Sequence, residues 1–189
     1  MSGAPRILAL AGSTRKESFN RKMLKLAADA ARAAGGTVTH VELADFPMPI
    51  FDQDLEAAEG APPKAAALRK LFAEHQGLLI ASPEYNSSVT PLLKNTLDWV
   101  SRPSPVEAFK GKVACLIGAS PGMSGALRSM AALRSILGNI GVIVLPSQVS
   151  VTKAGDAFEA DGTLKDAKLR ASVDGAAGAL VDAVRKLHD

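Results

Sequence analysis

The chain has 189 residues, of which 47% are hydrophobic and 22% are charged. This composition is that of an ordinary globular protein, so it excludes an intrinsically disordered chain and favours a single domain, residues 1–189, with a substantial core. The formal net charge is +3, and the 22 basic and 19 acidic residues are interspersed without a basic block. We therefore expect no nucleic-acid partner.

The cysteine content and the length of the apolar runs indicate in which cellular compartment the protein is expected. The one cysteine, Cys115, has no partner for an internal disulfide and offers no metal-ligand spacing, so we expect a reducing environment and no metal site. The apolar run Ile7–Ala11 is short and is soon followed by Arg15 and Lys16, which is untypical of a signal peptide. No stretch approaches the roughly 18 apolar residues of a membrane span. The sequence thus predicts a cytoplasmic protein without a membrane partner.

The first half of the chain alternates strand and helix patterns. The continuous apolar run Ile7–Ala11 predicts a buried strand of a parallel sheet. Small and apolar residues at helical spacing follow it, and Gly35 and Gly36 predict where that helix ends. The next elements expected are a strand over 37–43, a proline-containing loop over 45–54, a helix over 63–74 and a strand over 77–82.

The second half repeats this alternation. Thr90 is suited to cap a third helix, and Pro91 to occupy its first position. The elements expected after it are a strand over 112–119, a loop over 120–125 that leads into a helix, a strand over 141–145, a polar connection over 153–162 and a final helix that includes 169–187. Five strands alternating with helices predict an α/β fold, with a doubly wound parallel sheet and helices on both of its faces.

A loop rich in hydrogen-bond donors follows the first strand. The segment GSTRKESFN, residues 12–20, carries a planar and permanently charged guanidinium at Arg15. Its other side-chain donors are Ser13, Thr14, Ser18 and Asn20. Together with the N-terminus of the helix that follows, these groups suit a phosphate. A polar turn with a helix cap is the alternative that this segment alone leaves open.

The neighbouring loops favour the phosphate hypothesis. In doubly wound sheets ligands bind outside the carboxyl ends of the strands, and the polar loops after the first, third and fourth predicted strands all emerge at that edge. The fingerprint G-x-G-x-x-G is absent after the first strand, and no G-K-[ST] closes a glycine loop. The first loop therefore suits a terminal phosphate monoester better than a buried pyrophosphate.

Three motifs, in this order, resemble a known family. They are GSTRKESFN at 12–20, PEYNSS at 83–88 and LKNTLDW at 93–99. In these segments the chain is similar to the NADPH-dependent FMN reductase family, a flavodoxin-like group that includes quinone, chromate and azo-compound reductases. The resemblance covers about the first two thirds of the chain and implies a five-stranded parallel sheet in the order 2-1-3-4-5.

The resemblance also implies non-covalently bound FMN and assigns residues to it. The family pattern places the FMN phosphate on Ser13, Arg15, Ser18 and Asn20. The residues that it places near the isoalloxazine ring are Pro83, Glu84, Tyr85 and Asn86, together with Ser120 and Gly122 of the third loop. The family often has paired glycines where this chain has Ser124 and Gly125. No protein acid, base or nucleophile is expected, because the hydride chemistry belongs to FMN.

The activity implied by the resemblance is that of an NAD(P)H-dependent oxidoreductase. NADPH or NADH would donate a hydride to bound FMN, which would then reduce a quinone or another small acceptor, such as free flavin, an azo compound or chromate. Members of the family commonly form dimers or tetramers. A homodimer or homotetramer is therefore implied as well.

Three alternatives belong to other functional classes. A flavodoxin-type electron carrier would also hold FMN, but such carriers are usually strongly acidic and flank the ring with several aromatics, whereas this chain has a charge of +3, one Tyr and one Trp. The second alternative is a non-catalytic protein that binds FMN or another phosphorylated ligand. The third is a serine hydrolase, since Gly118–Gly122 matches a G-x-S-x-G elbow with Ser120 as nucleophile. Against it, Pro121 lacks the N–H that an oxyanion hole needs, and the only downstream histidine is His188.

Overall fold

The chain folds around a parallel sheet of five strands, and the computed structural model describes residues 3–104 and 106–188. The strands are β1 (Arg6–Ala11), β2 (Thr37–Val41), β3 (Gly77–Ala81), β4 (Val113–Ala119) and β5 (Ile143–Val151). Every neighbouring pair is parallel, and the order across the sheet is β2-β1-β3-β4-β5. The predicted doubly wound sheet and its strand order are confirmed, and this order is the flavodoxin-like one.

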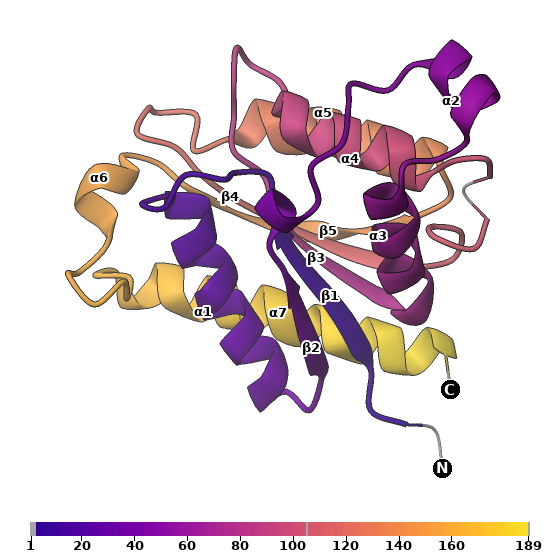
Figure 1. Cartoon of the computed structure of the whole chain (residues 1–189). Helices are drawn as coiled ribbons and strands as arrows, with labels where there is room; N and C mark the ends of the chain where they lie inside the picture. The colour runs from indigo at the N-terminus through magenta and orange to yellow at the C-terminus, as the bar shows by residue number, and fades with distance from the viewer. Residues whose placement is uncertain (1–2, 105, 189) are drawn as a thin grey trace.

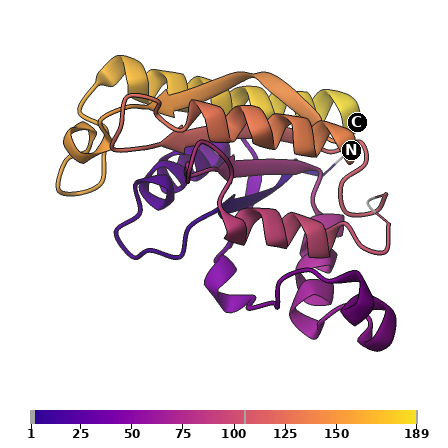
Figure 2. The same ribbon diagram turned by 90° about the horizontal axis from the view of Figure 1, so that it is seen from above.

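Helices cover both faces of the sheet (Figure 1, Figure 2). They are α1 (Phe19–Ala33), α2 (Gln53–Glu59), α3 (Pro63–Glu74), α4 (Pro91–Val100), α5 (Leu127–Asn139), α6 (Ala154–Ala157) and α7 (Ala167–His188), with a 3-10 helix at Leu43–Asp45. The α1 and α7 helices pack against each other on one face, and α3, α4 and α5 cover the other. No helix in the described part of the chain is long and apolar enough to cross a membrane.

The strands supply side chains to two separate cores. In β1, Ile7 and Ala9 face the core under α1 and α7, whereas Leu8 and Leu10 face the core under α3, α4 and α5. All four side chains are fully buried. This burial on both sides explains why β1 reads as a continuous apolar run. Because both faces of the sheet are covered, the sheet itself is open to a ligand only at the ends of its strands.

The α2 helix was not predicted and begins inside the expected loop 45–54. None of its residues is buried, so no apolar stripe marks it in the sequence. Local capping holds it instead, because the Asp52 carboxylate accepts hydrogen bonds from the N–H of Asp54 at 2.8 Å and of Leu55 at 3.2 Å. The helix ends at Gly60, whose φ of 78° suits a residue without a side chain.

The β5 strand differs most from its expected range, 141–145. It begins at Ile143 and continues to Val151 as an edge strand of the sheet. Several of its residues are exposed, and Pro146 lies within it, which together obscure the strand pattern. An edge strand tolerates proline because one of its sides needs no ladder hydrogen bonds.

The segment 46–52, which we call the proline strap, is held against α4 by side chains of the LKNTLDW motif. The Asn95 amide donates to the carbonyl of Pro49 at 2.8 Å and accepts from the N–H of Phe51 at 2.8 Å. The Trp99 indole N–H donates to the same Pro49 carbonyl at 2.8 Å. Asn95 and Trp99 therefore have a structural role. The side chain of Ile50, in the middle of the strap, is 86% exposed.

Candidate active site

A small cavity opens where β1, β3 and β4 end, and its volume is about 60 Å³. Eight of the ten residues assigned to FMN by resemblance line it, namely Ser13, Arg15, Ser18, Asn20, Pro83, Glu84, Tyr85 and Ser120. The lining is completed by Phe19, Ala119 and Pro121, which were not predicted. The structure thus brings the three polar loops together at the carboxyl edge of the sheet, and only Asn86 and Gly122 of the assigned set lie outside the lining.

The first loop leaves β1 at Gly12, where no side chain would fit without displacing its neighbours. The Gly12 N–H donates to the Ala81 carbonyl at 2.9 Å, and its own carbonyl accepts from the Thr90 hydroxyl at 2.8 Å. A Cβ at this position would lie 3.1 Å from both Pro83 Cδ and Leu93 Cβ. Glycine therefore allows the loops after β1 and β3 to meet.

The loop before α1 and the first turn of that helix form a cradle for an anion. Ser18 is the N-cap residue and only 4% exposed, yet its side chain makes no capping hydrogen bond. The N–H groups of Phe19 and Asn20, in the first helical turn, therefore remain available at the positive end of the helix dipole. The exposed Arg15 guanidinium donates to no protein acceptor within the described residues. This donor set fits a phosphate group.

Ser13 and Asn20 are both buried in the cradle, and Asn20 has a second attachment. The Ser13 hydroxyl accepts from the N–H of Arg15 at 3.3 Å, which shapes the loop. The Asn20 amide donates to the carbonyl of Ala119 at 2.8 Å and accepts from the Ala119 N–H at 2.9 Å. Only one N–H of this side chain is left for a phosphate. The link from α1 to the end of β4 was not predicted, because nothing in the sequence pairs positions 99 residues apart.

Glu84 is the one carboxylate in the cavity lining, and its carboxylate group is bound to residues at the start of α5. Its side chain, 6% exposed, forms a salt bridge to Arg128 at 2.6 Å and accepts from the Ser124 hydroxyl at 3.2 Å. Desolvation acts to raise the pKa of Glu84, but the hydrogen bonds from Arg128, the Ser129 N–H and Ser124 outweigh it, so the pKa is lowered. The carboxylate is ionised at neutral pH and neutralised locally, so it does not repel an anion in the cradle.

The loop after β3 ends in a tight turn that presents Tyr85. The N–H groups and carbonyls of Tyr85 and Ser88 bond reciprocally, at 3.1 and 3.0 Å. Between them, Asn86 and Ser87 have positive φ values of 49° and 65°, as in a type I′ turn. Tyr85 is 51% exposed. An aromatic side chain is therefore available to a planar ligand next to the cavity.

Ser120 lacks the partner that a nucleophilic serine needs. Its hydroxyl donates to the Gly122 carbonyl at 3.4 Å, and Pro121 follows it without an N–H. His188 lies at the opposite end of the sheet, beside Arg6 at the start of β1. His75 is also remote from Ser120, because its ring nitrogens bond to the Leu71 carbonyl and the Thr39 hydroxyl. Ser120 therefore pairs with neither His75 nor His188.

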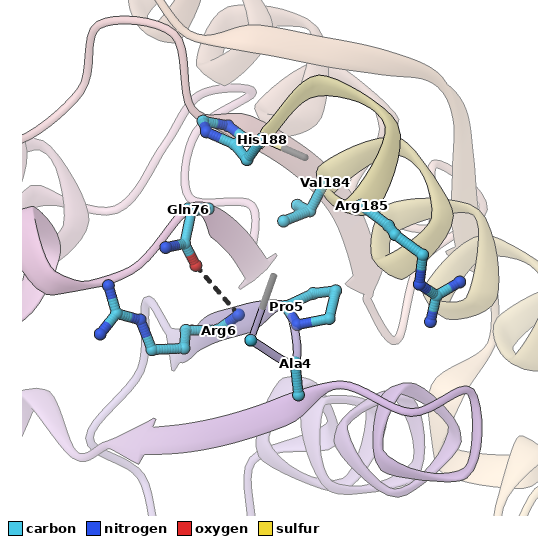
Figure 3. A pocket seen from close by; sticks show the side chains of 8 residues that line it. Ala4, Pro5, Arg6, Gln76, Val184, Arg185 and His188 are labelled. Atoms are coloured by element: carbon cyan, nitrogen blue, oxygen red, sulfur yellow. Dashed lines mark hydrogen bonds between the residues drawn. The ribbon is translucent and has the colours of Figure 1, made fainter. Parts of the chain in front are cut away.

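A larger cavity, of about 290 Å³, lies at the amino end of the sheet, against the C-terminal turn of α7. Arg6, Arg185 and His188 line it, but Figure 3 shows that the two guanidinium groups point away from each other. Arg185 is engaged with Asp182 at 2.9 Å and with the Ala34 carbonyl at 3.3 Å. The side chains do not converge on a ligand. Nor do three or more His, Cys, Asp or Glu side chains gather as metal ligands anywhere in residues 3–104 and 106–188.

Fold and cradle together define a class, the flavodoxin-like proteins that take a phosphorylated ligand at the carboxyl edge of the sheet. Comparison with known proteins identifies the family within this class, because the profile of the NADPH-dependent FMN reductase family matches residues 5–156. The chain belongs to this family. It is a flavin-dependent NAD(P)H oxidoreductase with FMN as its cofactor.

Individual relatives agree with this assignment. An NAD(P)H-dependent FMN reductase of Pseudomonas aeruginosa is 36% identical over an alignment of 193 positions that covers 100% of both chains. A quinone reductase of Escherichia coli K12 is 34% identical over 145 residues, covering 77% of this chain and 76% of that protein. The solved structure of the flavoenzyme FerB, an NAD(P)H:(acceptor) oxidoreductase from Paracoccus denitrificans, superposes with a TM-score of 0.83 at 30% identity, covering 97% of this chain and 98% of that one.

Proposed function

We propose that this chain reduces quinones or similar small acceptors with NADPH or NADH, through FMN bound at the carboxyl edge of the sheet. The observation that carries the proposal is the cavity in which donors from three loops converge. In the proposal the phosphate is held by Ser13, Arg15, Ser18 and Asn20. The flavin ring is received by Pro83, Glu84, Tyr85 and Asn86, with Ser120 and Gly122 at its rim.

The size of the cavity supports this division between the two ends of the cofactor. Ligand pockets that enclose a whole drug-sized molecule have volumes of roughly 300–1,000 Å³. A cavity of about 60 Å³ suits the phosphate alone. The ring would then lie outside the cavity, next to the exposed Tyr85, where one of its faces stays open to nicotinamide and acceptor in turn.

The protein's own part in the reaction is to bind and orient. When bound, FMN supplies the chemistry that accepts a hydride from nicotinamide and passes electrons to the acceptor. The chain supplies the anion cradle at Arg15 and Ser18, and the turn that carries Tyr85. No side chain of the cavity is arranged as a nucleophile or a proton relay, which agrees with an open site that takes acceptors of several shapes.

Anaerobic spectroscopy tests the proposal directly. The purified holoprotein should show the absorption of oxidised flavin, lose it on addition of NADPH, and recover it on addition of benzoquinone. Steady-state rates should follow ping-pong kinetics, because nicotinamide and acceptor would use the same face of the ring. A protein that stays bleached when the quinone is added would contradict the assignment of the acceptor.

A flavodoxin-type electron carrier is the second candidate, and two observations disfavour it. The net charge is +3 rather than strongly negative. The single tryptophan, Trp99, is 1% exposed and held by the proline strap, so Tyr85 is the one Tyr or Trp side chain that can flank the ring. Turnover with NADPH and free quinone separates the two functions, because a carrier would need a partner reductase.

We also propose that the protein is a cytoplasmic homodimer or homotetramer. The exposed apolar side chain of Ile50, flanked on α4 by the opposite charges of Lys94 and Asp98, supports self-association through the proline strap. The buried free thiol of Cys115 agrees with a reducing compartment. Light scattering on the wild type and on Ile50→Lys tests the assembly, since a monomeric wild type would contradict it. Fractionation of the host cell tests the compartment.

A further inference from the structure

The turn at residues 83–88 is held in a conformation that Ser87 does not favour. Asn86 and Ser87 both adopt positive φ values, of 49° and 65°. Side chains at such angles are strained, more so for serine than for asparagine, and the conformation persists only where its surroundings hold it. The reciprocal bonds between Tyr85 and Ser88 close the turn but do not anchor it to the rest of the protein. An anchor must lie at its base.

The anchor is the carboxylate of Glu84, which is attached to the start of α5. One of its oxygens accepts from Arg128 Nε at 2.8 Å and from the Ser124 hydroxyl at 3.2 Å. The other oxygen accepts from the backbone N–H of Arg128 at 3.1 Å and of Ser129 at 3.4 Å. These two N–H groups belong to the first turn of a 13-residue helix. Glu84 therefore caps a helix that begins 43 residues further along the chain.

The α5 helix needs this cap because its own N-cap residue supplies none. That residue is Ala126, which has no polar side chain and a left-handed φ of 69°. A carboxylate at a helix N-terminus satisfies unpaired N–H groups and interacts favourably with the helix dipole. Helix α5 and the turn after β3 consequently stabilise each other.

A second link makes the attachment rigid. The Ser129 hydroxyl, fully buried, donates to the Pro83 carbonyl at 2.7 Å and lies 2.6 Å from the Ser82 hydroxyl. Ser82, Pro83 and Glu84, at the base of the turn, are thus all hydrogen-bonded to the first turn of α5. The tip remains free, since Tyr85 is 51% exposed.

We propose that Glu84 is a positioning residue for the flavin ring, because its carboxylate fixes the base of the turn that carries Tyr85. This inference rests on the proposed placement of the ring over residues 83–86. Glu84 acts through the turn and through α5 rather than on the reacting atoms. Ser124 contributes a donor where the family often has glycine, so this chain adds a bond to the attachment.

Glu84→Gln is the variant that tests the role with the least change of shape. The amide oxygen can still accept from the Arg128 guanidinium, but the amide NH₂ would face the N–H groups of Arg128 and Ser129. Donor would then meet donor, and the base of the turn would shift. Glu56→Gln is the matched control, because Glu56 forms a comparable salt bridge to Arg102 at 2.9 Å and is 17% exposed. It lies on α2, away from the three loops.

Titration with both FMN and riboflavin separates the two ends of the cofactor. We expect Glu84→Gln to raise the dissociation constants of FMN and of riboflavin by the same factor, about tenfold to a hundredfold, because the loss is at the ring end. The visible circular dichroism of saturated holoprotein should also change, since it reports how the bound ring is held. Glu56→Gln should keep wild-type values in both measurements.

Two results overturn the inference. One is a Glu84→Gln protein that binds both flavins within about twofold of the wild type with an unchanged dichroism spectrum. The other is a loss confined to FMN, which would assign Glu84 to the phosphate end. Should Glu84→Gln fail to fold, Arg128→Met replaces it. That side chain is 61% exposed, its removal leaves the two backbone bonds in place, and the expected loss for both flavins is about twofold to fivefold. A wild type that binds no FMN would overturn the proposed function itself.

Discussion

The sharpest prediction concerns Arg15, whose guanidinium is proposed to bind the FMN phosphate. In the described part of the chain this group donates to no protein acceptor, so Arg15→Ala removes no bond from the protein itself. We expect the thermal unfolding of the apoprotein to be unchanged. The affinity for FMN should fall, because a planar charged donor is lost from the cradle.

The expected loss can be worked out from one contact. A hydrogen bond to a charged group contributes about 1.5–3 kcal/mol, which corresponds to a loss of about 10- to 150-fold in affinity. The remaining donors, Ser18 and the N–H groups of the first turn of α1, stay in place and keep measurable binding. Riboflavin has no phosphate, so its dissociation constant should be the same in the wild type and in Arg15→Ala.

Fluorescence titration of the apoprotein with both flavins provides the assay. Arg32→Ala is the control, because Arg32 lies in the last turn of α1, at the end of the helix that is remote from the Arg15 loop, and is paired with Asp29 at 2.9 Å. An FMN dissociation constant in Arg15→Ala within about threefold of the wild type would refute the assignment of Arg15. An equal loss for riboflavin would show that the side chain acts at the ring instead.

Three further predictions concern the folded protein. Asn20→Ala should lower the free energy of unfolding by about 2–4 kcal/mol even without FMN, because both backbone groups of Ala119 lose their partners; urea denaturation measures this, and an unchanged apoprotein would contradict it. Gly12→Ala should cost about 1–3 kcal/mol in the same assay, since its Cβ would lie 3.1 Å from three neighbouring atoms. Burial, with a smaller effect of the Arg6 charge, lowers the pKa of Lys112 to about 8, so the unfolded chain binds more protons than the folded one between about pH 8 and pH 10.5. The unfolding free energy of the wild type relative to Lys112→Met should therefore rise by about 1 kcal/mol from pH 7 to pH 9, and a difference that stays constant with pH would refute this.

The sheet and most helices could be predicted because their signals are local. The Ile7–Ala11 run is apolar throughout since both faces of β1 are covered, and Thr90 and Pro91 mark the start of α4 directly. The Thr90 hydroxyl does accept from the Leu93 N–H, at 3.3 Å. Periodicity could not reveal α2, which buries nothing, nor the full length of β5, whose exposed edge carries polar residues and a proline.

The sequence indicates which residues belong to the site, but it does not indicate the hydrogen bonds that join them. The chemistry of the Arg15 guanidinium predicts a phosphate at the first loop, and the structure brings Arg15 to the lining of the cavity. The partners of Glu84 and Asn20 could not be found in this way, because both side chains bond to residues 40 or more positions away. Such long-range contacts depend on which loops the fold brings together, and no local pattern in a single sequence indicates them.

The bonds that join the loops have a consequence for how the cofactor arrives. Thr90 ties the second loop to Gly12, Asn20 ties the first loop to Ala119, and Glu84 ties the second loop to the start of α5. A ligand that meets loops already ordered loses little affinity to their ordering. The backbone amides that are hydrogen-bonded between these loops and strands, such as those of Gly12 and Ala119, should therefore exchange their hydrogens slowly in the apoprotein, and FMN should bind in a single concentration-dependent step without prior ordering of the loops.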